Sequence, residues 1–271
     1  MTSLPFALTD PMLTTWTLAF VLVMSRTSAL VMVMPGLGEQ SLPMMVRAGI
    51  TLTLTALLLP LVAPLSDAGA LGRLSPAGLL VMIAVELFAG VLIGWMAKLI
   101  TLALPIAGQM IAMFIGISSV LQPDPDLGSG SSAPARFMNL LAPLVLLMTG
   151  AYVFPIHAVL GSYSLIPPGG GLMMHPVAWP MLGDATHGVI QLTERSFTLG
   201  LELSAPFLIL SLVWQLMLGI MTRLLPTLQI YNAATPLQML GGIALLGFTI
   251  RVLIAVWQEQ ASDVFQTLPG L

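Results

Sequence analysis

Cysteine is absent from this chain, and charged residues are scarce. Among its 271 residues there is no cysteine, and only 7% are Asp, Glu, Lys or Arg. Without cysteine there is no disulfide, no zinc site built on thiolates and no thiol nucleophile. Soluble domains carry about 25% charged residues, so this sequence could not cover a surface that faces water on all sides. The net charge of -3 gives no reason to expect a nucleic-acid partner.

The motifs of soluble enzymes are also missing. The only lysine, Lys98, follows Ala97, which excludes a G-x-x-x-x-G-K-[ST] phosphate loop. There is no G-x-S-x-G elbow. His157, His175 and His187 lack the spacing of a metal site. The sequence therefore predicts a protein that is not an enzyme and binds no cofactor or metal.

Apolar residues dominate what is present. They make up 57% of the chain, and the mean hydropathy is +1.00. A membrane-spanning helix needs about 20 apolar residues. The sequence predicts an all-α, polytopic membrane protein with one membrane-embedded domain over 1–271, no soluble domain and about six long kinked helices. The expected spans are 11–34, 42–65, 76–104, 135–160, 188–225 and 236–257, with loops at 66–75, 122–134 and 162–187. Pro143 and Pro155 lie inside the fourth span and predict a kink or a helical hairpin there.

One further apolar segment, 107–125, is too interrupted for an ordinary span. It reads AGQMIAMFIGISSVLQPDP, and Gly108 and Gly116 interrupt it. Irregular backbone at membrane depth is tolerated only inside protein or beside a water-filled cavity. We therefore expect a broken, re-entrant segment that acts as a gate, a plug or a substrate path. Met110, Met113 and Phe114 would bracket a constriction, and ordinary core filling is the alternative.

Ionisable residues lie within or beside the apolar segments: Arg26, Arg47, Glu86, Lys98, Glu194, Arg195, Glu202, Arg223 and Arg251. Each costs at least about 2.5–3.5 kcal/mol at a helix centre and usually faces a bundle interior or a wet cavity. A proton or ion relay is one interpretation. Pairing between helices or between subunits is the favoured one. Gly90 and Gly94 form a G-x-x-x-G motif, which predicts the close approach of two helices.

Several of these residues, in this order, resemble the FliR/SctT family of type III export-gate proteins. Met24-Ser-Arg26, Pro35, Pro43, Arg47 and Pro60 resemble its opening. The run from Ala107 to Ser118, with Asp124-Pro125 after it, resembles its pore-plugging loop, A-G-E-I-I-G-x-Q-M-G-x-S followed by D-P. Arg223-Leu-Leu-Pro226 and Pro236 resemble its late R-x-x-P motif. Gln109, Ala112 and Phe114 depart from the loop, where Glu, Gly and Gln are common.

The resemblance implies a component of the protein-export gate in the bacterial inner membrane, at the flagellar basal body. Its partners would be FliP-like and FliQ-like membrane subunits, an FlhB-like switch protein and unfolded export substrates in transit. Seven residues would form the plug that seals the pore at rest: Gly108, Gln109, Met110, Met113, Phe114, Gly116 and Ser118. Gly108 and Gly116 would permit the turn of this plug. Asp124 and Pro125 would follow it. The counterpart in a virulence injectisome is the alternative, and a secondary transporter is a more distant one.

Overall fold

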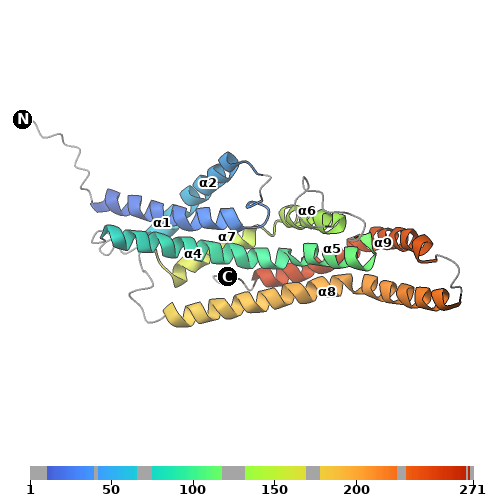
Figure 1. Ribbon diagram of the computed structural model, residues 1–271. Helices are drawn as coiled ribbons and strands as arrows, with labels where there is room; N and C mark the ends of the chain where they lie inside the picture. The colour runs from blue at the N-terminus through green and yellow to red at the C-terminus, as the bar shows by residue number, and fades with distance from the viewer. Residues whose placement is uncertain are drawn as a thin grey trace, which may run out of the picture. The chain divides into compact units, whose positions relative to one another are not determined.

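Helices make up the regular structure of the described residues in the computed structural model (Figure 1). It describes residues 11–39, 42–65, 75–117, 132–168, 178–224, 230–266 and 268. The elements are α1 (Pro11–Val33), α2 (Met44–Val62), the 3-10 helix η1 (Ala63–Leu65), α4 (Pro76–Thr101), α5 (Ala103–Phe114), α6 (Ala133–Met148), α7 (Val153–Leu165), α8 (Ala178–Leu224) and α9 (Ile230–Gln266). The all-α prediction is confirmed.

Five helical stretches within the described residues are long and apolar enough to cross a membrane. They are Trp16–Val33, Met44–Leu65, Pro76–Phe114, Gly183–Leu224 and Ala234–Gln266. Helices α6 and α7 become a sixth span if they are counted together, and they are bent by 68°. The prediction of about six spans with a bend in 135–160 is therefore confirmed.

The bend between α6 and α7 lies at a glycine. Pro143 and Pro155 were the expected causes, yet Pro143 lies inside α6 and Pro155 inside α7. Helix α6 ends at Met148, and Gly150 follows with φ of 76°. A glycine in the left-handed region is a common way for a helix to end, since it carries no Cβ to clash.

The predicted bounds of one loop and of one span are wrong. The predicted loop over 162–187 is helical at both ends, because α7 continues to Leu165 and α8 begins at Ala178. Helix α9 extends beyond the predicted span 236–257 on both sides. Each helical segment beyond the predicted bounds is more polar than the apolar run beside it. Hydropathy alone therefore predicts helices that are too short.

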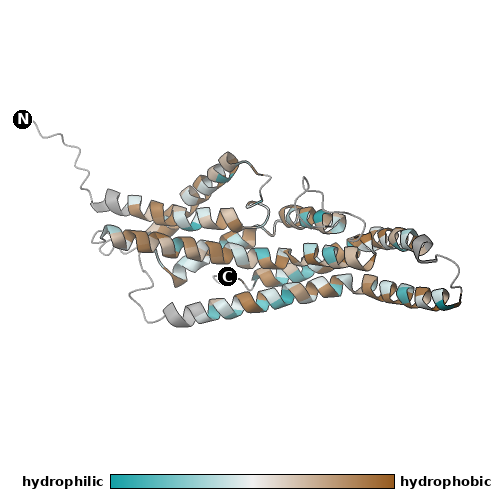
Figure 2. Ribbon diagram, in the orientation of Figure 1, coloured by the Kyte–Doolittle hydropathy of each residue, from teal (hydrophilic) through white to brown (hydrophobic). Residues whose placement is uncertain are grey.

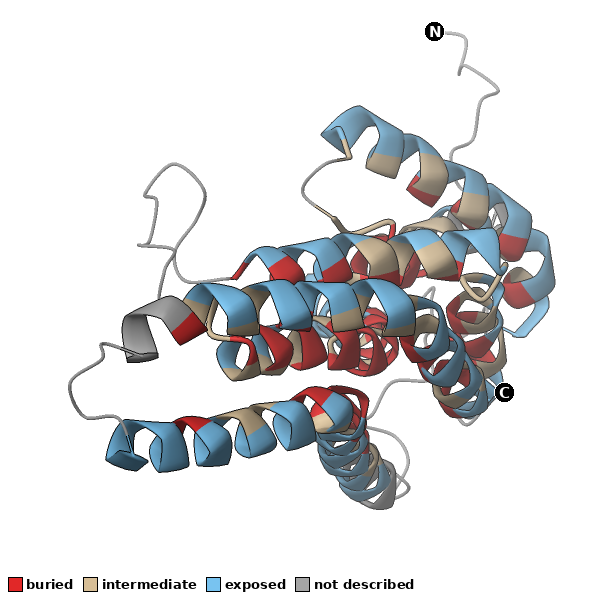
Figure 3. Ribbon diagram, turned by 90° about the vertical axis from the view of Figure 1, so that its right-hand side faces the viewer, coloured by how far each residue is buried: buried red, intermediate tan, exposed pale blue. Residues whose placement is uncertain are grey.

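Several polar side chains are buried with the apolar core, and many large apolar side chains are exposed. Arg26, Thr27 and Thr55 are buried, whereas Met45 and Phe248 are 88% and 86% exposed. Apolar residues lie on most helices (Figure 2), and large parts of their surfaces are exposed (Figure 3). A large exposed apolar surface is unusual for a soluble monomer and fits contact with lipid or with other chains.

The chain divides into two compact units. The first comprises Met1–Lys98, Gly150–Ile190 and Val264–Leu271, and the second comprises Leu99–Thr149 and Gln191–Asp263. Three of the boundaries fall inside α4, α8 and α9, and the fourth lies between α6 and α7. We call them the first and second units and describe each by itself.

In the first unit, α1 and α4 approach closely at the G-x-x-x-G motif. A methyl group at Gly90 would collide with the carbonyl oxygen of Arg26, and one at Gly94 would lie 3.1 Å from the Cβ of Val33. The motif therefore serves helix packing, as its spacing predicts.

Candidate functional site

The segment expected to be broken, 107–125, begins as a regular helix that continues to Phe114. Helix α5 runs from Ala103 to Phe114, and only Leu102 separates it from α4. The interruption follows from Pro105, which has no N–H to donate to the carbonyl of Thr101 and crowds it. Leu102 N–H donates instead to Leu99 O at 3.2 Å. The interruption therefore lies at Leu102, five residues before the predicted segment begins at Ala107, and it is shorter than that segment.

Side chains from α8 and α9 satisfy the backbone beside this interruption. The Ser196 hydroxyl donates to Leu99 O at 2.6 Å, and the Trp257 indole N–H donates to Ile100 O at 3.2 Å. Both donors are buried, Trp257 at 1% exposure. Because backbone groups at membrane depth need internal partners, these two bonds stabilise the α4–α5 junction.

Small residues form the buried face of α5. Ala107, Gly108 and Ala112 are buried there with Ile111. Gly108 was expected to permit a turn, and that expectation is wrong, because it lies within the helix. Its role is close packing: a methyl group at Gly108 would lie 2.7 Å from the Cα of Ala135 in α6.

The turn occurs at Gly116. Its φ is +82°, a conformation that L side chains rarely adopt. Helix α5 ends two residues earlier, at Phe114, and Gly116 lies in the turn that follows it. Ser118, Asp124 and Pro125 lie outside the described residues.

The exposed face of α5 carries Gln109 and Met113, four residues apart. The Gln109 side-chain oxygen accepts hydrogen bonds from Ser132 N–H at 3.1 Å and from the Ser132 hydroxyl at 2.9 Å. Ser132 is also the N-cap of α6, where its Oγ accepts from Ala135 N–H at 3.4 Å. Met113 is 64% exposed. This face therefore combines a fixed polar contact with an uncovered methionine.

The other two residues expected at a constriction point elsewhere. The sulfur of Met110 accepts a hydrogen bond from the Ser204 hydroxyl at 3.5 Å. Phe114 lines a pocket, and its carbonyl accepts from the side-chain N–H of Gln238 at 2.9 Å. Of the three apolar side chains, only Met113 is left open to a partner.

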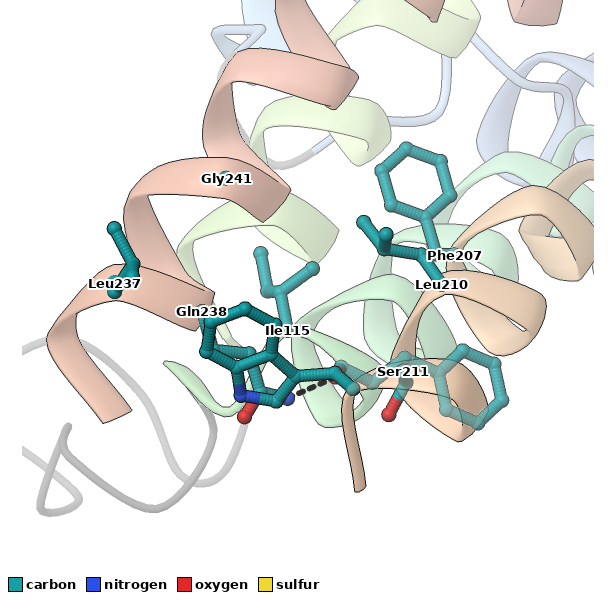
Figure 4. A pocket seen from close by; sticks show the side chains of 9 residues that line it. Ile115, Phe207, Leu210, Ser211, Leu237, Gln238 and Gly241 are labelled. Atoms are coloured by element: carbon teal, nitrogen blue, oxygen red, sulfur yellow. Dashed lines mark hydrogen bonds between the residues drawn. The ribbon is translucent and has the colours of Figure 1, made fainter. Parts of the chain in front are cut away.

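The pocket at the end of α5 has a volume of about 100 Å³ (Figure 4). Ile115 lies between α8 residues on one side and α9 residues on the other. The lining residues are Phe114, Ile115, Phe207, Leu210, Ser211, Trp214, Leu237, Gln238 and Gly241. The buried indole N–H of Trp214 has no hydrogen-bond partner among the described residues. The pocket is thus mostly apolar, with one open donor.

A second polar cluster surrounds Arg26 in the first unit. Arg26 is fully buried and donates to a Glu86 carboxylate oxygen at 2.6 Å, to the Ser162 hydroxyl at 2.8 Å and to Ile166 O at 3.0 Å. Its guanidinium lies 4.0 Å from the centre of the Tyr163 ring. One side chain therefore connects α1, α4 and α7.

The remaining sequence-predicted residues are dispersed. Arg47 donates to Glu39 O, and Lys98 lies half-buried in the last turn of α4. Arg223 and Arg251 are exposed. Pro35 follows α1, Pro43 is the N-cap of α2, Pro236 lies inside α9, and Pro226 is outside the described residues.

Sequence reasoning missed the polar residues that hold these clusters. They are Ser132, Ser162, Tyr163, Ser196, Gln238 and Trp257. Ser132 carried a signal, since a serine before an apolar run is a common N-cap. The others are single polar groups in apolar runs, and their partners are more than 90 residues away. In the described part of the chain, no three His, Cys, Asp or Glu residues are placed to hold a metal ion.

Comparison with known proteins gives one consistent result. Residues 17–264 match the family described as bacterial export proteins, family 1. The flagellar biosynthetic protein FliR of Caulobacter vibrioides is 30% identical, over 90% of this chain and 92% of that protein. Those of Escherichia coli and Bacillus subtilis are both 24% identical. They cover 91% and 93% of this chain, and 89% and 94% of their own lengths.

Proposed function

This chain belongs to family 1 of the bacterial export proteins, the FliR family, and we propose that it helps to form the export pore and closes it at rest with the segment 108–118. It is a non-enzymatic, multi-span membrane protein of the flagellar export apparatus. FliP-like and FliQ-like subunits would complete the pore for unfolded substrates, with an FlhB-like protein alongside.

The placement of α5 supports a closing role. Helix α5 is fixed at its start by Ser196 and Trp257, which bind the adjoining carbonyls, and at its end by Gln238. It packs against α6 on one side and leaves Met113 exposed on another. A helix held at both ends that presents a methionine can seal a pore by excluding water, and the flexible methionine side chain can still move for a passing chain.

The flagellar assignment is favoured over the injectisome counterpart. The relatives that match over about nine-tenths of the chain are flagellar biosynthetic proteins. A secondary transporter would be expected to contain internal repeats and charges paired at the membrane midplane. The buried pair Arg26–Glu86 instead connects α1 and α4 within a close-packed cluster, in which the Arg26 guanidinium donates to three oxygen atoms.

Native mass spectrometry tests the assembly. The tagged chain would be co-expressed with its neighbouring membrane genes and purified in mild detergent. We expect a defined complex that contains this chain together with several copies of two smaller hydrophobic subunits. A stable monomer or a simple homodimer would contradict the proposal, and substrate flux would then test the transporter alternative.

A further inference from the structure

Arg251 is a charged residue in the apolar part of α9. From Ala234 to Gln258 it is the only Asp, Glu, Lys or Arg in the sequence. It lies 17 residues after Ala234, which is about 25 Å along a helix at 1.5 Å per residue. An arginine at such a position is costly unless another group compensates its charge.

Among the described residues, no group supplies that compensation. Arg251 is exposed, and its side chain has no hydrogen bond or ion pair to any residue that the structure describes. The opposite face of α9 is the one packed within the second unit, where Leu253 and Trp257 are 5% and 1% exposed. Arg251 therefore points away from its own unit.

The residues around Arg251 form a continuous exposed face. At alternating spacings of three and four, this face consists of Ala244, Phe248, Arg251, Ala255 and Gln258, and all five are exposed. Such a spacing repeats every seven residues and is the period of helix-to-helix packing. Phe248 is 86% exposed, and no atom lies within 4 Å of a methyl group placed at Gly247. The face can therefore accept another helix without rearrangement.

We propose that this Arg251 face of α9 binds a membrane helix of a neighbouring subunit that carries a carboxylate opposite Arg251. The inference rests on the proposed function, since it assumes a multi-subunit pore. We assign a carboxylate because an anion offsets the arginine, because Asp and Glu are the anions that a protein helix supplies, and because Arg pairs with carboxylates through two parallel hydrogen bonds. A helix is required because Phe248 and Ala255 on the same face need apolar contact.

Charge reversal tests the carboxylate. In the co-expressed complex, we expect Arg251→Glu to lower the yield of assembled complex at least tenfold and Arg251→Lys to retain most of it. Arg195→Glu is the control for charge reversal, because Arg195 is exposed on α8 and lies outside this face, where it already has a partner within the chain and donates to Gln260 Oε1 at 2.9 Å. An Asp or Glu to Arg substitution in a partner subunit should restore assembly with Arg251→Glu. If the Arg251→Glu complex assembles at the wild-type yield, this inference is wrong and the proposed function still stands.

Photo-crosslinking tests the helix. A photoreactive residue at Phe248 should crosslink to a partner subunit, and one at Ile243 should not. Ile243 is 51% exposed but lies off the face. Crosslinks from Phe248 to lipid only, or rescue of Arg251→Glu solely by a substitution within this chain, would contradict the inference. If the wild-type chain assembles with no partner, the proposed function fails and this inference fails with it.

Discussion

The Arg26 cluster shows how single residues hold this chain together in an apolar environment. Arg26 uses its fork of donors on three oxygen atoms from Glu86, Ser162 and Ile166. An arginine suits this position better than a lysine because its planar donors are preorganised and its face can lie against Tyr163. A buried ion pair is stabilising only while both partners are present, since either one alone is a buried, uncompensated charge.

Removal of one partner should therefore cost more than removal of both. We expect Arg26→Ala and Glu86→Ala each to lower the free energy of unfolding by about 3–5 kcal/mol. The double variant Arg26→Met/Glu86→Met should cost less than either single variant, because it leaves no uncompensated charge buried. Thermal unfolding of the detergent-solubilised protein measures all of them. A single variant that unfolds at the wild-type temperature would show that the pair is not buried as described.

At the scale of helices, two kinds of contact explain the packing. Glycine allows close contact between α1 and α4 at Gly90, and between α5 and α6 at Gly108. Side-chain donors satisfy carbonyls at helix ends, as Gln238 does at the end of α5. Each kind of contact leads to a separate prediction.

Gly90→Ala should push α1 away from α4. The added methyl group would collide with the backbone carbonyl of Arg26, which cannot rotate away as a side chain would. Overpacking of this kind costs about 1–3 kcal/mol. Gly49→Ala in α2 is the control, because nothing lies within 4 Å of its added methyl group and alanine favours helix. We expect a lower unfolding temperature for the first variant and an unchanged or higher one for the second; equal behaviour would refute the close contact.

Gln238→Leu should loosen the end of α5. It removes the hydrogen bond to Phe114 O, and such a bond contributes about 1 kcal/mol. Amide hydrogen exchange of residues 113–116 should then become faster. Gln215→Leu is the matched control, since Gln215 is an exposed glutamine on α8. Unchanged exchange in Gln238→Leu would mean that other contacts hold α5 in place.

At the scale of the whole molecule, the sequence predicts the class and the spans well. Composition identifies a membrane protein, and apolar runs of about 20 residues locate the spans. It predicts α5 less well because Gly108 signals a break and a close helix contact equally, and only the position of Ala135 decides between them. The partners of Arg26 are also hidden, since Ser162 is 136 residues away in the sequence. Family resemblance supplies the export role, which no single motif carries.

The central claim is that α5 and the turn at Gly116 close the pore through Met113. Ion conductance of the purified, assembled complex in a planar bilayer tests it most directly. Met148→Ser is the matched control for Met113→Ser, because Met148 is 80% exposed but lies at the end of α6. The account predicts a wild-type complex that conducts almost no ions, a conducting Met113→Ser complex and a closed Met148→Ser complex. A complex that stays closed both with Met113→Ser and after deletion of 108–118 would contradict it.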